Sequence, residues 1–176
     1  MRDFGVVHLS AGDLLRAERN SGSADAELIN NYIKEGKIVP VEITVGLLKR
    51  AMQKEMAENG KFTFIIDGFP RNYDNLSGWN KICGGTFATV PFLLHFECSE
   101  EEMTKRIMDR AEKSEVKRKD DNLETIKKRF KVYNEQTMPV VEVFRSEKKC
   151  VDLDAMDTID NVYEKVKGVF TERLNL

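Results

Sequence analysis

Residues 65–72, IIDGFPRN, decide the fold, because an apolar run ends there in an acidic residue and a Gly-Phe-Pro-Arg turn follows at once. The preceding residues 62–66 (FTFII) are aromatic and β-branched, which is the composition of a short buried strand. Asp67 therefore falls at the carboxyl end of that strand, where open α/β sheets bind their ligands. We expect a binding crevice at this edge of a sheet.

The same stretch allows a functional and a structural interpretation. A carboxylate at Asp67 suits a hydrated Mg²⁺, which takes one or two carboxylates together with water and substrate phosphates. Arg71 offers a planar fork for a phosphate or a carboxylate. In the structural interpretation, Asp67 caps the next helix and Arg71 lies in solvent. These eight residues by themselves favour neither interpretation.

Length and composition indicate one globular domain over residues 1–176. Charged residues make up 33% of the chain and hydrophobic residues 41%. The formal net charge of −2 gives no general attraction to nucleic acid or to an anionic membrane. No apolar stretch reaches membrane-spanning length, and the first residues lack the apolar run of a signal peptide. We therefore expect neither nucleic acid nor a membrane as a partner.

The cysteines and histidines limit the chemistry further. Cys83, Cys98 and Cys150 are odd in number and widely spaced, which favours reduced, buried thiols in the cytosol or the nucleus. His8 and His95 are the only histidines, and both adjoin apolar residues of predicted strands. We therefore expect them to be core or strand-edge side chains rather than metal ligands or members of a catalytic triad.

Strand-like and helical patterns alternate along the chain. Strands are predicted over residues 4–9, 62–66, 92–96 and 150–153. Helices are predicted over residues 13–19, 28–35, 40–59, 73–83, 100–112, 122–135 and 159–170, with a further piece that resumes after a break near Pro139 and runs to residue 146. This alternation predicts an α/β fold with a doubly wound parallel sheet and flanking helices.

The predicted strand ends bring polar residues to one edge of the sheet. Residues 10–13, 67–72 and 154–155 should therefore be neighbours. Six arginines are candidates to surround them: Arg16, Arg71, Arg106, Arg110, Arg118 and Arg129. Arg106 and Arg110 are four apart and are expected on one helical face. Residues 113–131 are basic but interleaved with acids and without aromatic stacking residues, so nucleic-acid binding is a minor alternative.

Several segments, in order, resemble the nucleoside monophosphate kinases of the adenylate kinase family, and among them the UMP/CMP kinases. They are HLSAGDLLR (8–16), EGKIVPVEIT (35–44), IDGFPRNYDNLSGWN (66–80), RKDDN (118–122), IKKR (126–129) and LDA (153–155). The resemblance implies a P-loop NTPase-like kinase fold, with an acceptor-binding flap over residues 24–54 and a lid over 111–121. It also implies a monomer that transfers the γ-phosphoryl group of ATP, with Mg²⁺, to UMP, CMP or dCMP.

The same resemblance implies a role for individual residues. It assigns the acceptor nucleotide to Arg16, Lys37, Ile38, Val39, Gly68, Phe69, Pro70, Arg71, Asn72 and Asn75. Asn72 could equally be the N-cap of its helix. It assigns ATP to Arg106 and Ala155, the transferring phosphoryl group to Arg110, Arg118 and Arg129, the lid to Asp120 and Asp121, and a water-mediated Mg²⁺ contact to Asp67. Clustered arginines suit phosphoryl transfer, which depends on positioning and dispersed positive charge.

Two departures from the family pattern bear on activity. The chain contains no glycine-rich GxxxxGK loop and no strand before it, and Lys117 stands where the lid usually has a glycine. In the related fold the missing strand is central, so the strands over 62–66 and 92–96 should face a gap or pair with each other. Because one preorganised donor contributes about 10²–10³ in rate, we expect negligible transfer and weak nucleotide binding by this chain.

Three accounts remain open at this point: a UMP/CMP kinase without its N-terminus, a non-catalytic nucleotide-binding or regulatory protein, and an interaction module whose open sheet edge pairs with another chain. The intact arginine set favours the first two accounts over the third.

Overall fold

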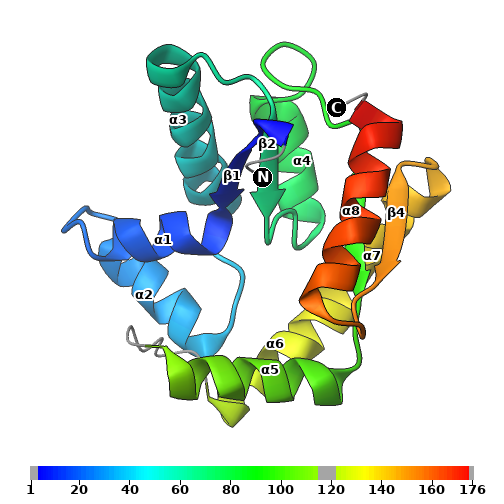
Figure 1. Cartoon of the computed structure of the whole chain (residues 1–176). Coiled ribbons are helices and arrows are strands. Elements are labelled where there is room, and N and C mark those ends of the chain that lie inside the picture. Colours follow the sequence, from blue (N-terminus) through cyan, green and yellow to red (C-terminus); the bar gives the residue numbers. More distant parts are fainter. Residues whose placement is uncertain (1–3, 115–121, 175–176) are drawn as a thin grey trace.

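The computed structural model describes residues 4–114 and 122–174, which form an α/β fold of short parallel strands and flanking helices (Figure 1). The strands are β1 (Val7–Ser10), β2 (Phe64–Asp67), β3 (Leu93–Glu97) and β4 (Cys150–Asp154). Each lies within three residues of its predicted position, because the aromatic and β-branched runs favour extended backbone.

The strands pair in parallel, but they do so in two separate sheets. In the first sheet Val7 pairs with Phe64 and Ser10 with Asp67, and in the second Leu93 pairs with Cys150 and Glu97 with Asp154. Within residues 4–114 and 122–174 no ladder joins β2 to β3. The predicted parallel pairing is confirmed. Two separate pairs of strands replace the single doubly wound sheet, so of the two outcomes expected for the strands over 62–66 and 92–96, a gap or direct pairing, the gap is observed.

The helices are α1 (Ala11–Arg19), α2 (Ala26–Glu35), α3 (Val41–Asn59), α4 (Tyr73–Ile82), α5 (Glu100–Lys113), α6 (Leu123–Val132), the π-helical turn η2 (Tyr133–Thr137), α7 (Met138–Ser146) and α8 (Ile159–Leu174). Their ends follow the predicted capping signals. The Ser10 and Ser99 side chains accept the backbone N–H groups three residues later. Gly36 and Gly60 end α2 and α3 with φ of 68° and 60°, a left-handed conformation that glycine adopts without strain.

The predicted helix break near Pro139 is wrong. The chain stays helical from α6 through η2 into α7, and Pro139 lies at the start of α7. Proline lacks the N–H of a regular helix, and its ring would collide with the carbonyl four residues earlier. The wider π-helical turn directly before it relieves both problems without breaking the helix.

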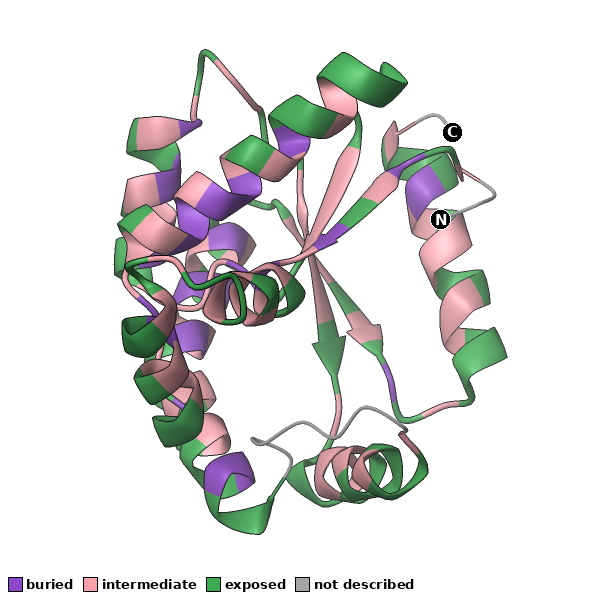
Figure 2. Cartoon of the chain, turned by 90° about the vertical axis from the view of Figure 1, so that its left-hand side faces the viewer, coloured by how far each residue is buried: buried purple, intermediate pink, exposed green. Residues whose placement is uncertain are grey.

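The buried core lies mainly between α3, α4 and the first sheet, as the purple segments of Figure 2 show. Leu48, Val45 and Cys83 have no exposed surface, and Trp79 packs beside them. The two helices approach so closely that a β-carbon on Gly78 would collide with the Val41 side chain. The glycine is therefore required by packing rather than by its backbone conformation.

A smaller packing centre joins α8 to the second sheet. Phe170 is buried and meets the rings of Phe4 and Phe92 at centroid distances of 5.3 Å and 6.3 Å. Ile159, at the first turn of α8, is 87% exposed and takes no part in this packing. No helix in the described part of the chain has the length and apolar character needed to span a membrane.

All three cysteines are free, as predicted, although only Cys83 is fully buried.

Candidate functional site

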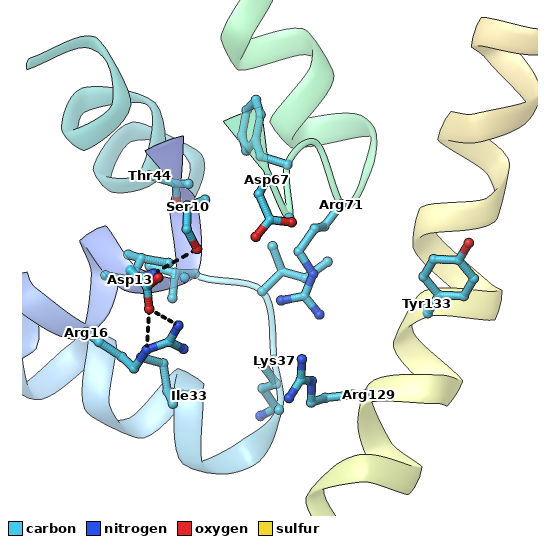
Figure 3. A pocket seen from close by; sticks show the side chains of 18 of the residues that line it. Ser10, Asp13, Arg16, Ile33, Lys37, Thr44, Asp67, Arg71, Arg129 and Tyr133 are labelled. Carbon is cyan, nitrogen blue, oxygen red and sulfur yellow. Dashed lines mark hydrogen bonds and ion pairs between the residues drawn. The ribbon is translucent and has the colours of Figure 1, made fainter. Parts of the chain in front are cut away.

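A cavity of about 560 Å³ opens where the ends of β1 and β2 meet α5 and α6 (Figure 3). Most of the predicted site residues line it: Arg16, Lys37, Ile38, Val39, Asp67, Gly68, Phe69, Arg71, Asn75, Arg110 and Arg129. Parallel strands direct their carboxyl ends to one edge, and this edge is where Ser10 and Asp67 stand in register. The predicted crevice beyond Asp67 is therefore confirmed as a feature of the fold.

The first wall is built by the start of α1. Ser10 caps the helix and accepts the Asp13 N–H at 3.3 Å. Arg16, one turn later, donates to Asp13 Oδ1 through Nε at 3.2 Å and Nη2 at 2.5 Å. This pair fixes the guanidinium at the pocket edge, so an anion entering the pocket meets a cation that is already oriented.

Arg71 is the most unusual cation of the pocket. Burial lowers the pKa of its guanidinium, and the positive charge of Arg129 lowers it further. Figure 3 shows the two guanidinium groups turned toward the same space. Within residues 4–114 and 122–174 no carboxylate forms an ion pair with Arg71. Two cations held together in a partly desolvated cavity provide a site for an anion with several oxygens, such as a phosphate.

The backbone of Arg71 is held at both ends. Its N–H donates to Asn75 Oδ1 at 3.1 Å, and its carbonyl accepts the Thr137 hydroxyl at 2.7 Å. The neighbouring glycine, Gly68, has a φ of 72° and so turns the chain sharply away from β2. These two hydrogen bonds anchor the backbone of the turn between β2 and α4 from which the Arg71 side chain extends.

A family model described as adenylate kinase matches residues 1–149 of this chain. The chain belongs to the adenylate kinase family. The prediction of a nucleoside monophosphate kinase, a phosphotransferase by class, is thereby confirmed at the level of the family.

Curated relatives of this adenylate kinase family member are named UMP-CMP kinases. The chicken (Gallus gallus) protein is 50% identical over 169 residues, which are 95% of this chain and 85% of the relative. The human protein is 48% identical over the same coverage. UMP-CMP kinase 3 of Arabidopsis thaliana is 47% identical over 168 residues, which are 96% of this chain and 78% of the relative.

Asn72 and Asn75, both predicted to bind the acceptor, have different surroundings in this family member. Asn72 lies outside the pocket lining, and its Oδ1 accepts the Asn75 N–H at 2.8 Å. Its alternative interpretation as the N-cap of α4 is confirmed. Asn75 is buried and lines the pocket. Since its Oδ1 accepts the Arg71 N–H, its NH₂ group is the part that can donate to a ligand. Pro70, like Asn72, lies outside the lining.

Arg106 and Ala155 are brought together, but outside the pocket. Arg106 Nη1 donates to the Ala155 carbonyl at 2.8 Å, while Arg106 Nε donates to Glu102 at 2.7 Å. The Ala155 N–H donates to the Glu97 carbonyl at 2.8 Å. Arg110, on the same helix, lines the pocket instead. The two arginines expected on one helical face therefore lie in different surroundings, Arg110 at the pocket and Arg106 outside it.

Other predicted residues lie at or beyond the edge of the described site. The Asp67 carboxylate is 63% exposed, and His8 Nε2 lies 3.7 Å from it. Lys37 is also exposed, and a hydrogen bond to Glu35 at 2.6 Å raises the pKa of its ammonium group. Arg118, Asp120 and Asp121, with most of the predicted lid, fall outside the described residues.

Sequence reasoning missed the side of the pocket formed by α5 and α6. Met103 and Ile107 of α5, together with Ile126, Phe130 and Tyr133, belong to the lining. The spacing of Ile126, Arg129, Phe130 and Tyr133 puts them on one helical face, which is the signal that could have found them. Thr44, the remaining polar addition, donates its hydroxyl to the Pro40 carbonyl at 3.3 Å.

A second polar cluster lies on the second sheet. Ligand atoms of His95, Glu97 and Asp152 lie within 4.8 Å of one another, a spacing that could hold a metal ion. Arg145 donates to Asp152 at 2.6 Å and to Glu97 at 3.2 Å. A guanidinium therefore already supplies the positive charge that these two carboxylates require.

Proposed function

We propose that this chain accepts UMP or CMP, including dCMP, in the pocket around Arg71, and that its site is built for phosphoryl transfer from ATP. The observation that carries this proposal is the partly desolvated Arg71–Arg129 pair, in which Arg71 has no carboxylate partner within the described residues. The names of the relatives support the choice of a pyrimidine monophosphate. A phosphate placed beside Arg71 supplies the counter-charge that Arg71 lacks within the described residues.

Four arginines of the pocket lining act on the phosphates. Arg71 holds the acceptor phosphate from the turn after β2, and Arg16 approaches it from α1. Arg129 and Arg110 reach the pocket from α6 and α5, where charge develops on the transferring group. Phosphoryl transfer involves little covalent chemistry for the protein, so its rate depends on positioning and on such fixed positive charges.

The base lies toward the linker between α2 and α3. Lys37, Ile38 and Val39 line that side, and the Phe69 ring adds an apolar surface. The buried Asn75 presents its NH₂ group, which can donate to O4 of uracil or to N3 of cytosine. A donor suits both pyrimidines, whereas the apolar wall limits the space for a larger purine.

Asp67 fits the Mg²⁺ that the family implies. It is an exposed carboxylate at the strand end beside the proposed phosphate site, and Mg²⁺ takes few protein ligands but several waters and phosphate oxygens. When bound, the ion neutralises phosphate charge and orients the oxygens of the two nucleotides. We further propose closure of the flap (24–54) and the lid (111–121) to exclude water, in a monomer that works in the cytosol or nucleus.

The ATP side of the site would be formed by residues from α5, from the end of β4 and from the lid. Arg106 and the Ala155 backbone would contact the ATP base after breaking their mutual hydrogen bond, and Arg118, Asp120 and Asp121 would act from the lid. The 176 residues hold no GxxxxGK sequence. This observation favours, for the 176-residue polypeptide tested by itself, the second candidate function of a nucleotide-binding or regulatory protein.

Fluorescence of the single tryptophan tests acceptor binding directly. Trp79 is buried and packs on Phe69, a lining residue, with ring centroids 5.7 Å apart. Titration with UMP, CMP and AMP should give saturable changes for the two pyrimidines and a weaker one for AMP. Equal affinity for AMP would remove the base-reading role of Asn75, and no response to any nucleotide would refute the proposal.

A coupled assay separates the two candidate functions. The 176-residue chain should show negligible transfer from ATP to CMP. The same chain preceded by a strand and a GxxxxGK loop taken from a UMP-CMP kinase relative should be active. If the fusion binds CMP but stays inactive, the binding-protein alternative is correct. Full activity of the unextended chain would contradict the expected impairment.

A further inference from the structure

A chain of hydrogen bonds runs from β4 across β3 to the pocket wall. His95 Nδ1 lies 2.7 Å from Asp152 Oδ1, and His95 Nε2 lies 2.5 Å from the Tyr133 hydroxyl. The imidazole is only 10% exposed. Tyr133 lines the pocket, and Figure 3 shows its hydroxyl turned away from Arg71 and Arg129. The ring thus faces the site while its hydroxyl is held from behind.

The partners determine which atoms carry the protons. Arg145 donates to both oxygens of Asp152, at 2.6 Å and 3.1 Å, and thereby holds the pKa of that carboxyl at about 2. An ionised carboxylate only accepts, so His95 Nδ1 is the donor to Asp152. Arg145 Nη2 also lies 3.3 Å from Nδ1, but a protonated nitrogen cannot accept, and the shorter contact to Asp152 prevails.

With the proton on Nδ1, the lone pair of the imidazole lies on Nε2, which accepts the Tyr133 hydroxyl proton. The two rings are nearly coplanar, with an interplanar angle of 9° and centroids 6.4 Å apart. This is the geometry of a hydrogen bond in the plane of both rings, because a face-to-face stack would bring the centroids closer. The bond fixes the Tyr133 ring in rotation as well as in position.

Holding Tyr133 also holds the end of α6. Tyr133 begins the η2 turn, and its N–H donates to the carbonyls of Arg129 and Phe130. Both of those residues line the pocket. A π-helical turn is less regular than an α-helix, and a side-chain anchor at its first residue fixes the preceding turn against the second sheet.

We propose that the hydrogen-bonded chain Arg145–Asp152–His95–Tyr133 is a positioning device that aims Arg129 at the phosphate of the bound nucleotide. His95 and Tyr133 are positioning residues that act through Arg129 and do not touch the reacting atoms. The role toward a nucleotide rests on the proposed function, whereas the ordering of α6 by the network does not.

Hydrogen exchange of the ligand-free protein tests the ordering. Tyr133→Phe and His95→Leu should speed amide exchange within residues 129–137 by about five- to tenfold, the effect of one lost hydrogen bond. Exchange in α4 should stay unchanged. His95→Gln should restore slow exchange, because an amide oxygen also accepts a hydroxyl proton. Unchanged exchange in both variants would overturn the proposal without reference to any nucleotide.

The control is Tyr73→Phe, which removes another tyrosine hydroxyl bonded nearby, to the Pro139 carbonyl at 3.4 Å, from a residue outside the pocket. It should leave exchange at residues 129–133 as in the parent. An equal acceleration in this control would show that any lost tyrosine hydroxyl loosens the segment, which would overturn the special role of Tyr133.

Nucleotide affinity tests the aiming of Arg129. Tyr133→Phe should weaken UMP binding about five- to tenfold and leave uridine binding unchanged, because the effect passes through the phosphate contact. An equal loss for uridine would overturn the proposal in favour of general loosening of the pocket. If the parent protein binds no UMP, the proposed function fails, and the exchange experiment still decides the ordering.

Discussion

Replacing Arg71 by methionine should have opposite effects on stability and on binding. Methionine keeps the apolar stem and leaves the two backbone hydrogen bonds of Arg71, to Asn75 and from Thr137, in place. It removes a guanidinium whose pKa is lowered first by burial and then by Arg129. We expect the ligand-free Arg71→Met protein to be more stable than the parent by about 0.5–1 kcal/mol, because an uncompensated cation is removed.

The same substitution should weaken the binding of UMP. A guanidinium–phosphate contact in a partly desolvated pocket contributes about 2–4 kcal/mol, which corresponds to a roughly 30- to 1000-fold loss of affinity. Saturating UMP should therefore raise the unfolding midpoint of the parent but not that of the variant.

Urea unfolding, followed by circular dichroism with and without UMP, measures both effects. Arg50→Met is the matched control, since Arg50 is an exposed arginine of α3 outside the pocket and should change neither quantity. Destabilisation of the ligand-free Arg71→Met protein by more than about 1 kcal/mol would refute the reasoning, because Arg71 would then have a structural partner.

Three further predictions concern packing and ionisation. Gly78→Ala should destabilise the protein by about 1–3 kcal/mol, because the added β-carbon collides with the Val41 side chain of α3. Gly46→Ala should stabilise it by up to about 1 kcal/mol, because the added β-carbon meets only the flexible end of Arg50. The urea midpoints of the two variants and the parent measure both effects. The pKa of Asp152 is lowered from 3.8 to about 2, so its ionised form contributes stability at pH values above 3.8, and this contribution is lost as the pH falls toward about 2. Asp152→Asn should therefore remove about 1 kcal/mol of acid-dependent stability between pH 4 and 2, a figure that is discounted because the side chain is 37% exposed. If the parent and the variant lose stability in parallel as the pH falls, this prediction is contradicted. Burial and Asp152 raise the pKa of the Cys150 thiol to about 11, so iodoacetamide at pH 8 should alkylate it roughly a hundredfold more slowly than a thiol of pKa 9; an ordinary rate would show that the thiol is accessible.

Local signals predicted most of the elements. Serine caps at Ser10 and Ser99 and glycine stops at Gly36 and Gly60 act within one helical turn, so a single sequence displays them. The predicted helix break near Pro139 was wrong because the rule that proline interrupts a helix applies to a regular α-helix. Here a π-helical turn precedes the proline and accommodates its ring.

The site was predictable where a residue follows a strand end and less so where it comes from a helix face. Asp67 ends β2 and Arg71 belongs to the turn that follows, so the positions of both follow from the strand. Asn72 illustrates the limit, because one amide suits both a pocket and an N-cap, and only its bond to the Asn75 N–H separates the two. Helical spacing places Tyr133 on the pocket face, but its hydrogen bond to His95 joins residues 38 positions apart, which no spacing rule reveals.

The pocket also connects the two pairs of strands. Arg71 extends from the turn after β2, whereas Arg129 extends from the α6–η2 segment that His95 ties to the second sheet. The Thr137 hydroxyl bonded to the Arg71 carbonyl is a cross-link between these halves. Across this junction the positive charge of Arg129 acts unfavourably on the buried Arg71 guanidinium. A bound phosphate reverses the sign of that interaction, and acceptor binding should therefore strengthen the junction as well as fill the site.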